Sequence, residues 1–192
     1  MSALALVAAL RDDARDWTRG RSPVARAGLF FYLAYAGCKH LKSGIGGEYT
    51  SWFAGITLAF HEMGHLVLSG AGQTVMLLGG SIFQLAIPVL AGLYLLFKQH
   101  DWFGVSVCGV WLATSLFELA TYIDDANRLN LPLVGFGEDV MHDWETLLTQ
   151  WHLLNQAQLI AGLTHALAIT TWGVSMAFGA WLLLQMRPLE RV

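Results

Sequence analysis

Apolar residues gather in long runs that predict helices able to cross a membrane. Between Tyr49 and Phe97 the only Asp, Glu, Lys or Arg is Glu62, and between Thr146 and Met186 there is none. A helix of about 20 apolar residues is long enough to span the hydrocarbon core. The pattern predicts about five membrane segments, over residues 24–41, 49–70, 74–98, 102–126 and 159–186.

Polar and glycine-rich stretches define the shorter elements. Residues 1–22 predict an amphipathic helix on the membrane surface, because an apolar start is followed by a highly charged stretch. Asn127 to Val140 predicts a polar loop, and Asp143 to Leu154 a short interfacial helix. Gly79-Gly80-Ser81 favours an irregular or re-entrant start to the third segment, shielded from lipid.

The predicted fold is therefore an all-α, polytopic helical bundle in a membrane. The surface helix over 1–22 precedes a single membrane domain over 23–192. That domain divides into a core at about 49–128, an interfacial loop and helix at 129–156, and a last membrane helix at about 157–186.

Composition supports this interpretation and excludes other classes of protein. Hydrophobic residues make up 55% of the chain and charged residues 13%, whereas charged residues are about 25% of a typical soluble domain. A net charge of -3 argues against a nucleic-acid partner. Basic residues near the start favour a cytoplasmic N-terminus; they are Arg11, Arg15, Arg19, Arg21 and Arg26.

The second apolar run contains His61-Glu62-Met63-Gly64-His65. Residues four apart share one helix face, so His61 and His65 can converge on one metal ion. Zinc bound by imidazoles lowers the pKa of its water to about 7. Glu62 can take a proton from that water and pass it to a leaving group. One ionisable group in mid-membrane costs about 2.5–3.5 kcal/mol, so three together predict a compensating cation. A structural metal or a proton path is the alternative.

A catalytic zinc site needs a third protein ligand and an open position for water. The candidates are acidic or imidazole groups further along the chain: Glu118, Asp124, Asp125, His142 and Asp143. Glu118, Tyr122 and Asp125 stack on one helix face, which favours Asp125. His142 can reach the metal or orient a ligand, whereas a place in the first turn of a helix already accounts for Asp143.

The chain resembles the site-2 protease family of intramembrane zinc metalloproteases, the M50 group. The resemblance covers roughly residues 49–128. It rests on the His-Glu-Met-Gly-His motif, on Gly79-Gly80-Ser81-Ile82-Phe83-Gln84, where the family usually has Asn for Gln84, and on Asp124-Asp125 near the end of the following span. The chain departs from the family's motif because no Gly follows these aspartates. The segment 122–148 looks like a feature of a small bacterial subgroup related to the M50 group.

The resemblance implies an intramembrane metalloprotease in the bacterial inner membrane that cuts membrane-embedded peptides. Zinc would be held by His61, His65 and Asp125 with His142 nearby, and Glu62 would be the general base. Gly79, Gly80 and Gln84 would bind the substrate backbone or the developing oxyanion. Partners would be a regulatory membrane protein or further copies of the chain in a homo-oligomer. Alternatives are a non-proteolytic membrane metal-binding protein, for transport or structure, and a di-iron oxidase.

Overall fold

The computed structural model describes residues 2–132 and 141–186, and within these ranges it is helical, with no strand. The all-α prediction is therefore confirmed. The helices are α1 (Ala3–Thr18), α2 (Val24–Ser43), α3 (Ala54–Val67), α4 (Gln73–Tyr94), α5 (Trp102–Asp125), α6 (Asp143–Gln150) and α7 (Ala157–Gln185). Three short helical turns join them: η1 (Ser69–Ala71), η2 (Leu95–Gln99) and η3 (Leu154–Gln156).

Within the described ranges, three helical stretches are long and apolar enough to cross a membrane, fewer than the five predicted. They are Gln73–Gln99 with 27 residues, Trp102–Asp125 with 24 residues, and Leu154–Gln185 with 32 residues. The two predicted segments that do not qualify are those of α2 and α3, and each has a physical cause. Helix α2 carries Arg26, Lys39 and Lys42 within its length. Helix α3 has 14 residues, and at 1.5 Å per residue it spans about 21 Å of a core about 30 Å thick.

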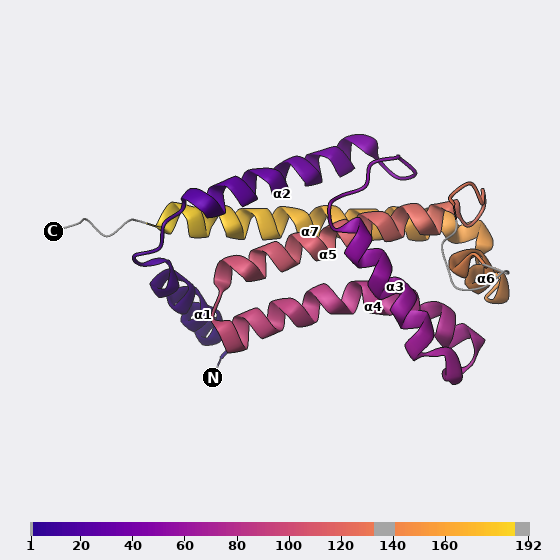
Figure 1. Cartoon of the computed structure of the whole chain (residues 1–192), viewed down its shortest axis with the longest axis horizontal. Helices are drawn as coiled ribbons and strands as arrows, with labels where there is room; N and C mark the ends of the chain where they lie inside the picture. The colour runs from indigo at the N-terminus through magenta and orange to yellow at the C-terminus, as the bar shows by residue number, and fades with distance from the viewer. Residues whose placement is uncertain (1, 133–140, 187–192) are drawn as a thin grey trace.

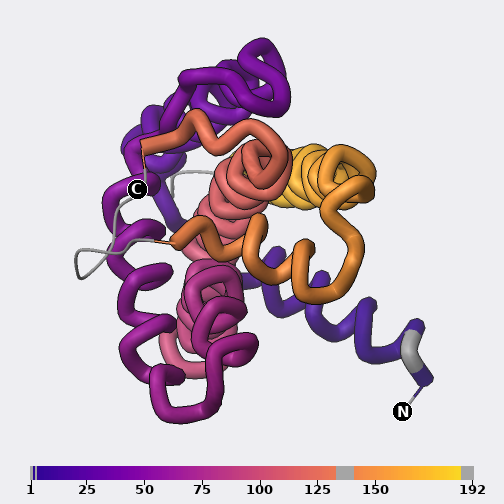
Figure 2. Tube along the Cα trace, turned by 90° about the vertical axis from the view of Figure 1, so that its right-hand side faces the viewer, coloured from indigo at the N-terminus to yellow at the C-terminus, as the bar shows by residue number. Residues whose placement is uncertain are grey.

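Helix α5 is the centre of the bundle, with α7, α4 and α2 running alongside it (Figures 1 and 2). It packs most extensively against α7. Small residues lie at this contact and let the two helices approach closely. Ser106 Oγ on α5 donates to the Ser175 backbone oxygen on α7 at 2.9 Å. A Cβ added to Gly179 would lie near the same Ser106 hydroxyl. The buried α5 therefore provides a rigid wall for the neighbouring helices.

Helix α3 packs on the first half of α4 through paired glycines. A Cβ added to Gly79 would lie 2.6 Å from the Gly64 carbonyl oxygen, so both backbones must lack side chains there. Helix α4 runs without interruption through Gly79 and Gly80. The prediction of an irregular or re-entrant start is therefore wrong. These glycines permit a close helix pair instead of breaking a helix.

The ends of the bundle carry the two amphipathic elements. Helix α1 confirms the predicted N-terminal helix, and it is attached where Trp102 Nε1 donates to Asp13 Oδ2 at 2.9 Å. Helix α6 confirms the predicted short helix and lies at the far end of the bundle from α1 (Figure 1). Of the predicted loop at 127–140, residues 133–140 lie outside the described residues.

Candidate metal centre

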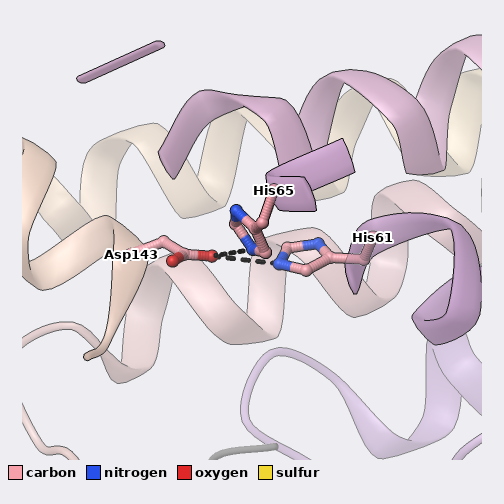
Figure 3. A group of neighbouring side chains, drawn as sticks. All are labelled: His61, His65 and Asp143. Carbon is pink, nitrogen blue, oxygen red and sulfur yellow. Dashed lines mark hydrogen bonds and ion pairs between the residues drawn. The ribbon is translucent and has the colours of Figure 1, made fainter. Parts of the chain in front are cut away.

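Two histidines of α3 and one aspartate of α6 point toward one another (Figure 3). His61 and His65 lie on consecutive turns, and their Nε2 atoms are 3.0 Å and 3.2 Å from Asp143 Oδ2. The ligand atoms of the three residues all lie within 4.8 Å of one another. His61 and Asp143 are buried, with exposed fractions of 7% and 5%. This group could hold a metal ion.

Neighbouring acceptors fix which nitrogen of each imidazole carries the proton. Gln84 Nε2 donates to the Ser115 backbone oxygen at 3.0 Å, so its Oε1 faces His61 Nδ1, 2.6 Å away. His65 Nδ1 donates to the Met76 carbonyl at 2.8 Å. With Nδ1 of each ring engaged in this way, both Nε2 atoms point at Asp143, where they can share a proton with the carboxylate or bind a cation. A metal-ligating histidine is oriented by its other nitrogen in the same way.

Asp143 is held in place from three sides. Its backbone N–H donates to Tyr122 Oη at 3.0 Å. His142 caps the start of α6, where its Nδ1 accepts from the Glu145 backbone at 3.2 Å. Trp144 Nε1 donates to Ser81 Oγ at 3.1 Å and so ties α6 to α4. Burial raises the pKa of Asp143, but the hydrogen bonds with the two histidines outweigh it and hold the pKa below its ordinary value.

Gly80 leaves the space that the two imidazoles occupy. A Cβ built on Gly80 would lie 2.6 Å from His65 Nε2 and closer still to His61 Nε2. Only glycine fits beneath the paired nitrogens. Gly79 and Gly80 are buried in α4 against α3, so the structure gives them a packing role, and their contact with substrate stays a prediction.

A cavity of ≈ 490 Å³ opens beside the three candidate ligands. Glu62 lines it and is half-buried, next in sequence to His61. Elsewhere the wall is largely apolar, and it includes Leu58, Leu66 and Met76. The Glu62 carboxylate and the three candidate metal ligands therefore line one cavity, which has room for a peptide segment.

The structure places Asp125, expected as the third ligand, outside this group. Both of its carboxylate oxygens accept backbone N–H bonds at 3.0 Å, from Asn130 and Leu131. His142 Nε2 lies 3.5 Å from Asp125 Oδ2 and so faces away from the α3 histidines. Burial lowers the pKa of His142, partly offset by the charge of Asp125. Asp124 pairs with Arg128.

The sequence therefore locates the two histidines but misjudges the carboxylate that meets them. Asp143 is among the candidates, but a place in the first turn of a helix already accounts for it, and stacking on the α5 face favours Asp125. The signal for Asp143 was the run His142-Asp143-Trp144, an imidazole and a carboxyl beside an aromatic residue. The contact with His61 joins residues 82 positions apart, and no local pattern reveals that.

No family model matches the chain, and neither a curated protein nor a solved structure does. The resemblance to site-2 proteases therefore depends on the motifs quoted above, and the chemistry of the site has to be argued from its own geometry.

Proposed function

We propose that this chain is a zinc-dependent intramembrane metalloprotease, similar to site-2 proteases, with His61, His65 and Asp143 as its zinc ligands. The observation that carries the proposal is the convergence of two imidazole Nε2 atoms on one buried carboxylate. Two lone pairs facing an anion repel unless a cation or a proton lies between them.

The donor set suits zinc. Two imidazole nitrogens and one carboxylate are the ligands of many catalytic zinc sites, and they leave a fourth position open. Tetrahedral zinc with bonds of about 2.0–2.1 Å separates its ligand atoms by about 3.3 Å. The N···O distances of 3.0 Å and 3.2 Å lie close to that separation. Bound zinc would supply a Lewis acid and a source of hydroxide near neutral pH.

Glu62 is the residue for proton transfer. It lines the cavity next to His61 and has no hydrogen-bond partner among the described side chains. Its carboxylate is therefore available to accept a proton from water during attack on a peptide carbonyl. It then returns that proton to the departing amine, so that no charge accumulates.

Other residues hold this constellation together. Gln84, predicted to bind substrate, is 5% exposed and uses both ends of its amide on His61 and Ser115. Its proposed role is therefore to orient His61. Tyr122 on α5 positions Asp143 directly, and Ser81 on α4 does so through its hydrogen bond with Trp144, the residue next to Asp143 on α6.

The substrate would be a membrane-spanning or membrane-proximal peptide. In the part of the chain that the structure describes, three helices have the length and hydropathy to cross a membrane, and the cavity wall is mainly apolar. An apolar segment that unwinds at the cavity would present its backbone to Glu62 and the metal ligands. We place the protein in the bacterial inner membrane with its N-terminus in the cytoplasm.

The test compares three purified proteins: wild type, Glu62→Gln and Asp143→Asn. Wild type should contain about one zinc per chain and cleave an apolar peptide in detergent. Glu62→Gln should keep zinc but lose turnover about 10²–10⁴-fold, the usual contribution of a general acid–base group. Asp143→Asn should lose zinc and activity together. Equal function of wild type and Glu62→Gln would instead favour a structural or transport role for the metal.

A further inference from the structure

We infer that Glu118 binds a cationic side chain, Lys or Arg, of the peptide substrate. This inference rests on the proposed function and adds a substrate class to it. Glu118 is a second carboxyl group in the wall of the same cavity, and neither the metal site nor the proton transfer uses it.

Glu118 faces the cavity from the central helix. It lies one turn before Tyr122, whose ring meets His61 edge to face with centroids 5.9 Å apart. Residues at i and i+4 share a helix face, so Glu118 lies on the same face of α5 as Tyr122. Its Oε1 accepts from Ser51 Oγ at 3.3 Å, which fixes the carboxyl group against the segment preceding α3.

The charge of Glu118 has no counterpart within the described part of the chain. None of the described residues that line the cavity is a lysine or arginine. Two cationic side chains of the described part are engaged elsewhere, because Lys39 Nζ lies over the Tyr49 ring and Arg128 pairs with Asp124. Asp143 has two imidazoles beside it, whereas Glu118 has a hydroxyl. When a cation arrives beside a carboxyl group in such an apolar cavity, the opposite charge favours the ionised form of that group.

The remaining wall suits the stem of a basic side chain. Leu58, Leu119 and Ala54 line the cavity near the polar groups, and the methylenes of Lys or Arg pack well on such surfaces while their charge meets a polar partner. Membrane segments are commonly flanked by Lys and Arg. The substrate class is therefore an apolar segment with a basic residue close to the cleaved bond.

Binding to zinc-loaded Glu62→Gln protein tests the inference without requiring cleavage. The probes are fluorescent apolar peptides that carry one Lys at successive positions. Each has a matched control peptide with norleucine, an uncharged side chain of similar length, in place of the Lys. Fluorescence anisotropy in detergent gives Kd. At one position or a few neighbouring ones, Lys should improve affinity about tenfold or more over norleucine, as expected for a desolvated charge pair. Equal affinities at every position overturn the inference.

Two double variants assign the preference to one carboxyl group. Glu118→Gln added to Glu62→Gln should reduce the preference for Lys to about one, while Glu48→Gln, the same change at an exposed position, should preserve it. Retained zinc shows that each variant is folded. A Lys preference that survives in Glu118→Gln overturns the inference. Cleavage by wild type separately tests the proposed function, since a protease without Lys preference disproves only the role of Glu118.

Discussion

Replacing Gly80 with alanine tests whether the paired imidazoles must sit where the structure has them. The added Cβ would lie 2.6 Å from His65 Nε2, whereas ordinary contacts begin at 3.4 Å. That ring must retreat by about 0.8 Å, and His61 by somewhat more. Metal–ligand distances tolerate only about 0.2 Å of displacement. The two ligands therefore cannot keep their metal-binding geometry.

The expected loss can be set from known cases. Changing groups that merely orient a ligand weakens metal binding by about 10–100-fold, so displacing two ligands should cost at least about 100-fold, or about 2.7 kcal/mol. The free energy of unfolding of the metal-free protein should change less. Overpacking costs about 1–3 kcal/mol, and the gain in helix propensity from Gly to Ala returns about 1 kcal/mol.

The assay is a zinc competition titration against a chelator, with thermal unfolding of the metal-free protein alongside. Gly173→Ala is the matched control, because nothing lies within 4 Å of a Cβ at that exposed position of α7. The control should bind zinc like wild type. The reasoning is refuted if Gly80→Ala also binds zinc with wild-type affinity, since the rings would then occupy different positions.

Other parts of the site give further predictions. Asp143→Asn should weaken zinc binding at least about 100-fold, whereas Asp125→Asn should leave it within about twofold and lower stability by about 1–2 kcal/mol; chelator competition and urea unfolding measure both. Gln84→Leu should weaken zinc binding about 10–100-fold by freeing the His61 ring, and unchanged affinity would exclude that role. The hydrogen bond with Asp143 raises the pKa of His65 despite desolvation. Below that raised pKa zinc must displace a proton from His65, so the rise in Tm that zinc causes should grow as the pH increases through it; a rise in Tm that does not change with pH would contradict the hydrogen-bonded pair.

The sequence predicts the helical class well because hydropathy and helix length are local properties. It predicts the continuity and length of a helix less well where packing against neighbouring helices decides them. Gly79 and Gly80 resemble a helix break in one dimension, yet they remain helical because Gly64 on α3 lies directly against them. The start of α3 at Ala54 likewise shortens a run that looked long enough to span.

The candidate site divides along the same line. His61, Glu62 and His65 are set by spacing within one helix, so the sequence reveals them. The third ligand, a carboxylate, depends on how α6 folds back onto α3, which Tyr122 and Ser81 control from other helices. That depends on three-dimensional packing, and helix-face stacking on α5 therefore pointed to the wrong aspartate for this contact.

Zinc-edge anomalous diffraction from crystals of the zinc-loaded protein tests the central claim most directly. The account predicts one anomalous peak per chain, about 2.0–2.2 Å from the Nε2 atoms of His61 and His65 and from the Asp143 carboxylate. A peak bound through Asp125, or no peak between the two α3 histidines at full zinc loading, would contradict it.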